Sequence, residues 1–237
     1  MSSEAIILAG GFGTRLRGVV DDLPKPMAPV AGKPFLEYLL QYLLGNGINH
    51  AILATGFMHQ KISGYFGNDF RGMKLDYSVE NEPLGTGGAI AEAMRLVKNE
   101  RVFVVNGDTF FGVHLDDFAA PGKTGKYKII VALKPMKNFD RYGAVSFSGN
   151  TITSFHEKRH RESGHINGGI YLLDKSWFLQ NSPSKVFSFE KDILERHLDK
   201  GITGCLVADE YFIDIGIPED YTRAINELPL KFRSFPL

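Results

Sequence analysis

The first half of the chain alternates short apolar runs with segments in which apolar residues recur every three or four positions. Short apolar runs are typical of buried strands, and the second spacing is typical of amphipathic helices. Strands are expected at residues 5–9, 51–54, 75–79 and 101–105, and helices at residues 35–44, 60–66 and 89–97. This alternation predicts an α/β fold, in which helices cover both faces of a predominantly parallel sheet.

The second half of the chain is less regular. Strands are expected at residues 127–133, 151–156 and 167–173, followed by a helix at residues 189–198 that Ser188 can cap. After a short strand and turn, a last helix is expected to begin at Pro218 and to end near residue 228. Residues 230–237 are expected to form a surface extension. No repeat or Pro/Ser-rich linker divides the chain, so we expect one domain over residues 1–237.

Composition narrows the function. The chain is 43% apolar, enough for a sizeable core, and its 27 basic and 27 acidic residues cancel. Zero net charge disfavours a nucleic-acid partner, because such proteins carry a basic surface. The single cysteine, Cys205, lies in an apolar run and is expected to be buried in a strand. With no leader and no apolar run of about 18 residues, we expect a cytoplasmic protein without a membrane partner. The sequence does not determine the oligomeric state, and a homodimer is the one assembly considered.

A glycine-rich segment follows the first expected strand. Gly10, Gly11 and Gly13 allow the backbone to approach a ligand and to point N–H groups at it, and Arg15 and Lys25 come next. Backbone donors with two cations suit a polyphosphate. A dinucleotide-binding motif is excluded because its sixth position is Leu16, and a Walker-type loop is excluded because Asp117 replaces its first glycine. The alternative is a tight turn between strand and helix.

Two aspartates are candidate metal ligands. Asp108 ends an apolar strand, and Asp214 is flanked by apolar residues. A carboxylate beside a phosphate-binding loop would repel the ligand unless a cation intervenes, and Mg²⁺ binds one or two carboxylates together with phosphate oxygens. A buried acid is costly unless it is paired or coordinated. The alternative is that both aspartates cap helices or turns.

The glycine-rich string and Pro24-Lys25-Pro26 together resemble the signature of the sugar-nucleotidyltransferase family, which joins a nucleoside triphosphate to a sugar 1-phosphate. The resemblance implies a Rossmann-like three-layer fold, with a nucleotide-binding part at about residues 1–112 and a sugar-phosphate-binding part at about residues 113–237. It implies that Asp108 and Asp214 hold the catalytic Mg²⁺. The implied nucleotide-binding residues are Leu8, Gly10, Gly11, Gly13, Thr14, Glu80, Glu82, Pro83, Gly85, Thr86 and Gly88.

The resemblance also implies residues for the chemistry and for the sugar. Lys25 and Mg²⁺ would stabilise the α-phosphate, Arg15 would hold the leaving pyrophosphate, and Lys158 would orient the attacking phosphate. The implied sugar-phosphate-binding residues are Asp140, Arg141, Gly143, Glu157, Lys158 and Asn167. Taken alone, the Glu157-Lys158 pair is typical of a solvated loop, and the segments around Asp140 and Asn167 are typical of turns.

The segment from Glu80 to Ala89 resembles the guanylyltransferase branch of the family. Guanine presents adjacent N1–H and N2–H₂ donors, which one carboxylate can accept, so Glu80 or Glu82 is expected to contact the base. A closer resemblance, to the members of this branch that act on a heptose phosphate, is carried by residues 106–111, 139–143, 166–173, 187–190 and 211–221. It implies transfer of GMP from GTP to a D-glycero-D-manno-heptose 1-phosphate, for bacterial surface glycan synthesis in capsule, lipopolysaccharide or S-layer. The alternatives are mannose 1-phosphate or another hexose 1-phosphate as acceptor, and a non-catalytic nucleotide-sugar sensor.

Overall fold

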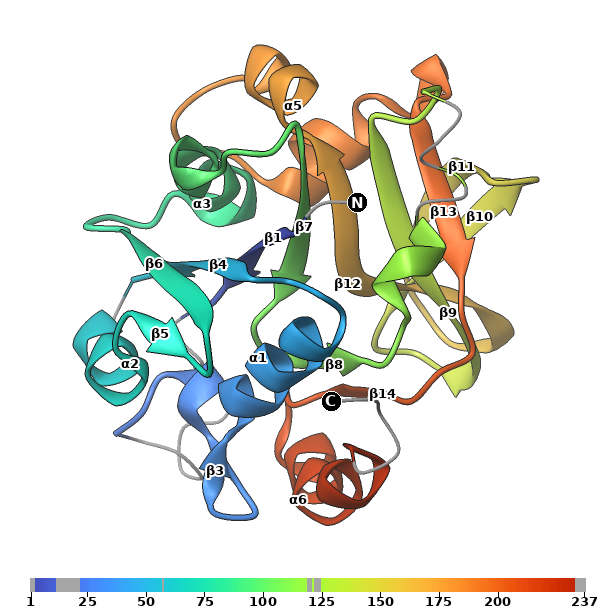
Figure 1. Cartoon of the computed structure of the whole chain (residues 1–237). Helices are drawn as coiled ribbons and strands as arrows, with labels where there is room; N and C mark the ends of the chain where they lie inside the picture. Colours follow the sequence, from blue (N-terminus) through green and yellow to red (C-terminus); the bar gives the residue numbers. More distant parts are fainter. Residues whose placement is uncertain (1–2, 12–21, 57, 119–120, 122–124, 233–237) are drawn as a thin grey trace.

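A ten-stranded sheet forms the centre of the molecule, in the order β10-β11-β13-β9-β12-β7-β1-β4-β6-β5 (Figure 1). The structure, a computed structural model, describes residues 3–11, 22–56, 58–118, 121 and 125–232. The strands of this sheet are β1 (Glu4–Leu8), β4 (His50–Thr55), β5 (Asp69–Phe70), β6 (Met73–Val79), β7 (Arg101–Asn106), β9 (Ile129–Phe139), β10 (Gly143–Ser148), β11 (Thr151–Lys158), β12 (Arg161–Asp174) and β13 (Thr203–Val207).

Four neighbouring strands, β7, β1, β4 and β6, are parallel. β1 is buried between two of them, so that Leu8 lies opposite Ala54 on one side and Asn106 on the other. The carboxyl ends of these strands, with the loops that follow them, therefore meet at one edge of the sheet. β13 is parallel to β9, while β10, β11, β12 and β5 add antiparallel pairings.

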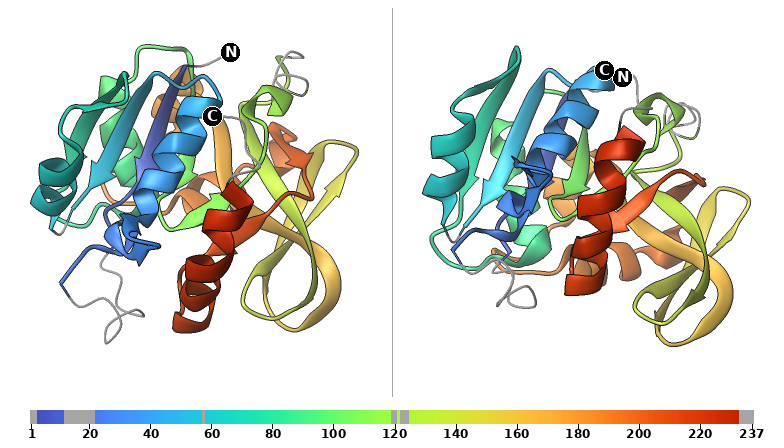
Figure 2. Two further views of the ribbon diagram at one scale, coloured as in Figure 1. Left: turned by 60° about the horizontal axis from the view of Figure 1, so that its bottom comes forward. Right: turned by 90° about the horizontal axis from the view of Figure 1, so that it is seen from below.

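Helices cover both faces of the sheet (Figures 1 and 2). Side chains of β1 alternate between the two layers: Ala5 and Ile7 pack on one face and Ile6 packs on the other. The first face is covered by α1 (Phe35–Gly45), α2 (His59–Phe66) and α6 (Pro218–Phe232). The second face is covered by α3 (Gly85–Ala93), α5 (Lys175–Asn181) and a π-helix at Glu190–Glu195. The α/β fold expected from the sequence is confirmed.

The remaining elements are short. Two-stranded pairings join β2 (Pro29–Val30) to β3 (Lys33–Pro34) and β8 (Thr109–Phe111) to β14 (Phe212–Asp214). The 3-10 turns are Lys25–Met27, Met94–Leu96, Leu115–Phe118 and Leu198–Lys200. Cys205 is buried in β13, as expected, and burial raises the pKa of its thiol to about 11. In the part of the chain that the structure describes, no helix is long and apolar enough to cross a membrane.

The expected boundaries differ from the structure at several ends. Strands β9 and β12 are longer than expected, and α3 begins at Gly85 rather than residue 89 and gives way to a 3-10 turn at Met94. The expected helix at residues 189–198 is the shorter π-helix; the Ser188 hydroxyl accepts the Lys191 N–H at 3.2 Å, as a cap does.

The expectation that residues 230–237 extend over the surface was wrong for residues 230–232, which continue α6. Phe232 is buried, with its ring centroid 5.3 Å from that of Tyr38 and 5.9 Å from that of Phe110. Phe232 continues the apolar stripe that contains Ala224 and Leu228, and this packing outweighs the helix-breaking tendency of Pro229.

A buried charge cluster lies near the amino ends of the parallel strands. The His50 ring contacts Glu4 Oε1 through Nδ1 at 2.7 Å and Asp76 Oδ2 through Nε2 at 2.8 Å. The backbone N–H groups of Lys98 and Asn99 donate to Glu4 Oε2 at 2.8 and 2.6 Å. Burial alone would raise the pKa of Glu4, but the hydrogen bonds from Asn99, His50 and Lys98 outweigh burial and hold it below its usual 4.5.

We expect Glu4→Gln to lower the free energy of unfolding by about 1–3 kcal/mol at pH 7, because hydrogen bonds to a buried charge are lost. A depressed carboxyl pKa contributes stability above pH 4.5 that is lost as the pH falls through the folded pKa. Urea denaturation between pH 7 and pH 3 should therefore show the parent and variant converging in acid. Glu92→Gln, on the exposed face of α3, is the control. If the difference in unfolding free energy between the parent and Glu4→Gln were the same at pH 3 as at pH 7, the depressed pKa assigned to Glu4 would be wrong.

Candidate active site

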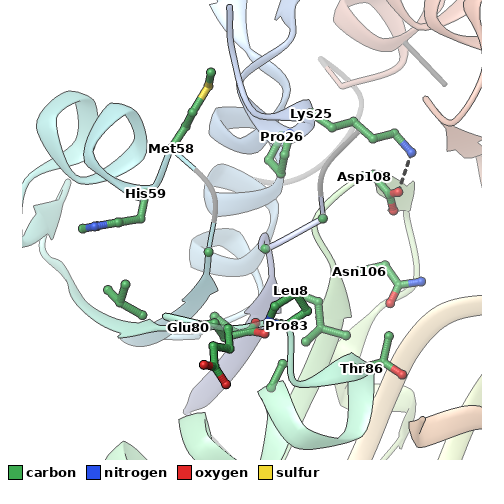
Figure 3. Close-up of a pocket in the computed structure, with 18 of the residues that line it drawn as sticks. Leu8, Lys25, Pro26, Met58, His59, Glu80, Pro83, Thr86, Asn106 and Asp108 are labelled. Atoms are coloured by element: carbon green, nitrogen blue, oxygen red, sulfur yellow. Dashed lines mark hydrogen bonds and ion pairs between the residues drawn. The ribbon is translucent and has the colours of Figure 1, made fainter. Parts of the chain in front are cut away.

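A cavity of about 680 Å³ opens where the parallel strands end (Figure 3). Leu8, Ala54 and Asn106 contribute the strand ends, and Glu190 contributes a wall from the second half of the chain. Met58 and His59 lie at one side of the cavity, and Lys25 and Asp108 lie at the other. The lining residues include ten that the sequence analysis selected: Leu8, Gly10, Gly11, Lys25, Glu80, Glu82, Pro83, Gly85, Thr86 and Asp108.

Glu80 is held by the loop that it begins. Its Oε2 accepts the Leu84 N–H at 3.0 Å, and its Oε1 lies so close to Gly10 that a β-carbon there would be 2.9 Å away. Burial raises the pKa of the Glu80 carboxyl, and the Leu84 hydrogen bond only partly offsets this. Glu82 is exposed at the cavity wall. Glu80 is thus a fixed acceptor, whereas Glu82 is open to solvent.

The start of α3 packs directly on the segment before the π-helix. Gly85 has a φ of +71°, and a β-carbon on it would lie 2.5 Å from the Phe187 carbonyl oxygen. The Gly87 N–H donates to this oxygen at 3.0 Å, and the Thr86 hydroxyl donates to Glu190 Oε2 at 2.7 Å. These contacts fix the position of the cavity wall that the start of α3 and Glu190 form.

Lys25, Asp108 and Asp214 meet at the other side. Lys25 Nζ lies 2.5 Å from Asp108 Oδ2 (dashed in Figure 3) and 3.8 Å from Asp214 Oδ1. The two acids are distant in sequence, but β8 and β14 pair with Thr109 opposite Asp214, and the Ile215 N–H donates to the Asp108 carbonyl at 3.0 Å. Backbone pairing therefore brings the two carboxylates together.

The environment of Asp214 disfavours its charge. Burial raises the pKa of this carboxyl and the neighbouring Asp108 raises it further, against the opposing effects of Lys25, the Gly216 N–H and Arg141. A cation between two such carboxylates relieves their repulsion. Lys25 supplies one positive charge here, and a divalent cation would suit the same oxygen ligands.

A second cavity, of about 340 Å³, adjoins Asp214. Asp140 and Arg141 line it, as does Tyr142, whose hydroxyl lies 3.5 Å from Asp214 Oδ2. The Arg141 guanidinium pairs with Asp220 at the start of α6, and Arg223 pairs with the same carboxylate at 3.0 Å. Arg141 is thus already held by an acid on α6.

Among the residues that the structure describes, five selected ones line neither of these cavities: Gly88, Gly143, Glu157, Lys158 and Asn167. Glu157 and Lys158 are exposed at the end of β11, with Lys158 opposite Gly143 of β10. Asn167 donates to the Tyr171 hydroxyl at 2.8 Å and accepts the Gly169 N–H at 3.0 Å, and Gly88 is buried in α3. Gly13, Thr14 and Arg15 lie outside the described residues.

The chain matches the family model described as "Nucleotidyl transferase" over residues 4–230. It belongs to the nucleotidyl transferase family. This confirms the family resemblance that the glycine-rich string and Pro24-Lys25-Pro26 carry.

Relatives of this nucleotidyl transferase match nearly its whole length. It is 50% identical to D-glycero-alpha-D-manno-heptose 1-phosphate guanylyltransferase of Aneurinibacillus thermoaerophilus, over 95% of this chain and 98% of the relative. It is 48% identical to the Campylobacter jejuni protein of the same name, over 92% of this chain and 96% of that relative. A solved structure of HddC from Yersinia pseudotuberculosis complexed with GMP-PN matches with a TM-score of 0.84 and 36% identity, covering 95% of this chain and 99% of that one.

The cavity of this nucleotidyl transferase also includes residues that the sequence analysis did not select as site residues. His59 begins α2, Asn106 ends β7 two residues before Asp108, and Glu190 begins the π-helix. The Thr86 and Ser188 hydroxyls both donate to Glu190 Oε2. Asn106 could have been found from its position at the end of a buried strand. No local pattern marks Glu190, because only the fold places it beside Thr86.

We expect Gly85→Ala to lower the free energy of unfolding of this nucleotidyl transferase by about 3 kcal/mol, because it combines a left-handed conformation with a backbone clash. Gly149→Ala is the matched control: its φ is +55°, but a β-carbon there meets nothing within 4 Å, so it should cost only about 1 kcal/mol. Urea denaturation of both variants measures the difference. Equal losses would mean that the contact with Phe187 contributes nothing.

Proposed function

We propose that this protein transfers GMP from GTP to D-glycero-D-manno-heptose 1-phosphate, giving GDP-heptose and pyrophosphate for bacterial surface glycan synthesis in the cytoplasm. The observation that carries the proposal is the match, at about half identity and over nearly the whole chain, to two guanylyltransferases named for this heptose phosphate. The neighbour complexed with GMP-PN supports guanine as the base. The cavity supports an enzyme rather than a sensor, because the lysine and both acids are present and adjacent.

In this proposal GTP occupies the larger cavity. The base lies towards Glu80 and Glu82, and the α-phosphate lies near Lys25 and Asp108. Residues up to about 112 supply most of this cavity, which fits a nucleotide-binding part at about residues 1–112. Residues from about 113 to 237 would bind the sugar phosphate, with the second cavity beside Asp214 providing space.

Asp108 and Asp214 are proposed to hold Mg²⁺. The donor set fits: Asp108 and Asp214 offer two adjacent carboxylates, and Mg²⁺ in nucleotide sites uses one or two carboxylates and completes its shell with phosphate oxygens and water. The raised pKa of Asp214 beside Asp108 also fits, since two buried carboxylates favour a cation between them. When bound, Mg²⁺ would neutralise charge on the α-phosphate.

The side chains then have separate tasks. An oxygen of the sugar phosphate attacks the α-phosphorus in line; a new phosphorus–oxygen bond forms as the bond to the β-phosphate breaks, and pyrophosphate leaves with that electron pair. Lys25 stabilises charge on the α-phosphate, and Arg15 with Gly10, Gly11, Gly13 and Thr14 holds the pyrophosphate. Lys158 is proposed to orient the attacking phosphate from the exposed end of β11, although it lines neither cavity. This phosphate is already ionised, so no general base is required.

The sugar is proposed to contact residues of the second half. Asp140 would offer a carboxylate for hydroxyls, and Glu157 would accept from another. Asn167, whose amide already bonds Tyr171 and Gly169, and Gly143, which packs on the His156 carbonyl, would complete the wall beside the sugar. Arg141 would reach the ligand from its ion pair with Asp220. Mannose 1-phosphate remains the alternative acceptor, since it lacks only the seventh carbon of the heptose.

The activity is tested with the purified protein, Mg²⁺, four nucleoside triphosphates and either heptose or mannose 1-phosphate. We expect the fastest pyrophosphate release with GTP and the heptose phosphate, and none after chelation of the metal. Faster turnover with mannose 1-phosphate would move the assignment to the hexose enzymes. Binding of GDP-sugar without turnover of any pair would identify a sensor.

Base selection gives a second prediction. In Glu80→Gln, an amide donor faces the guanine donors, and such a buried mismatch costs on the order of 1–3 kcal/mol, so kcat/KM for GTP should fall roughly 10- to 100-fold. The value for UTP should fall less or rise, and the ratio of the two cancels damage common to both substrates. Glu82→Gln is the matched comparison and is expected to change the ratio less. An unchanged ratio in both variants would assign base selection to backbone groups of residues 84–88.

A further inference from the structure

Lys25 lies where the two acidic side chains converge. Its ammonium is 2.5 Å from Asp108 Oδ2 and 3.8 Å from Asp214 Oδ1, and its side chain is only 14% exposed. In the proposed reaction these side chains have two different roles. Lys25 contacts the α-phosphate, while Asp108 and Asp214 hold a divalent cation. One arrangement of the lysine cannot serve both tasks.

The ammonium is packed in this position. A β-carbon on Gly216 would lie 3.4 Å from Lys25 Nζ and 2.9 Å from Asp214 Oδ1, so the glycine leaves room for the ion pair. The Gly216 N–H donates to Asp214 Oδ1 at 2.7 Å and fixes the acid that Lys25 faces. The backbone of Lys25 is equally fixed, since it begins a 3-10 turn between Pro24 and Pro26, both buried. Movement of the ammonium therefore depends on the long side chain of Lys25 rather than on its backbone.

Charge explains why Lys25 takes this position. Asp108 and Asp214 repel one another, and the ammonium offsets that repulsion. A divalent cation that approached the same oxygens would be repelled by the ammonium already between them. A nucleotide changes this balance, because its phosphates offer the ammonium another anion, within reach of a long and flexible side chain.

We propose that Lys25 is the counter-ion of the Asp108–Asp214 pair in the nucleotide-free protein, and that a nucleotide must draw it away before the pair takes a divalent cation. The inference rests on the proposed function for the identity of the phosphate ligand. It assigns Lys25 a positioning task besides its contact with the α-phosphate: the divalent cation enters with the nucleotide or after it. The enzyme then holds no tightly bound metal between turnovers.

The test measures binding of Mn²⁺ to nucleotide-free protein by calorimetry and by the electron paramagnetic resonance of the free ion. Mn²⁺ favours the same carboxylate ligands as Mg²⁺. We expect weak binding by the parent protein and at least 10-fold tighter binding by Lys25→Met, which removes the competing charge. Lys25→Arg keeps the charge and should bind as weakly as the parent. Lys33→Met is the control, because Lys33 is exposed and pairs with Glu37 instead.

Equal Mn²⁺ affinity in the parent and Lys25→Met would overturn the proposal, as would tight Mn²⁺ binding by the parent without nucleotide. If Lys25→Met does not fold, Lys25→Gln takes its place, since its amide can still donate to Asp108 without a charge. No nucleotide or sugar enters this measurement. Its failure is therefore distinct from a failure of the guanylyltransferase assay, and either result can stand without the other.

Discussion

The pairing of β8 with β14 is the contact on which the active site depends. These two strands are only three residues long, yet they join segments about a hundred residues apart and set Thr109 opposite Asp214. Phe110 and Ile213 bury this pairing in the core, so apolar packing stabilises it. α6 follows directly, and its Phe232 packs against Phe110. The geometry of the acid pair is thus determined by the hydrophobic core rather than by the acids themselves, which repel one another.

The sequence predicted those parts of the fold that depend on local pattern. The middle residues of β1, β4 and β7 are buried and apolar, and the loops after these strands carry glycines and acids, so the edge at which Gly10 and Asp108 meet could be anticipated. The neighbourhood of Asp108 and Asp214 followed only from the family resemblance. The continuation of α6 through Pro229 was missed because proline usually ends a helix, and tertiary packing of Phe232 outweighed that local preference.

The larger cavity shows a second limit of local reasoning. The second half of the chain supplies Glu190 to the cavity wall. It also supplies the Phe187 carbonyl, which accepts a hydrogen bond from the Gly87 N–H. These contacts arise only when both halves are folded together, so no spacing within either half signals them. They also mean that a fragment ending near residue 112 would lack one side of its ligand cavity.

The burial of Cys205 has a practical consequence. It is the single cysteine of the chain, it lies in β13 at 3% exposure, and its thiol remains protonated at neutral pH. The thiolate is the form of cysteine that attacks thiol-directed reagents, so this buried and protonated thiol reacts with them very slowly. A cysteine introduced at an exposed position, such as the end of β11, would carry a fluorophore or spin label without background from the native chain. Labels can therefore be attached to single introduced cysteines near the cavities without first replacing Cys205.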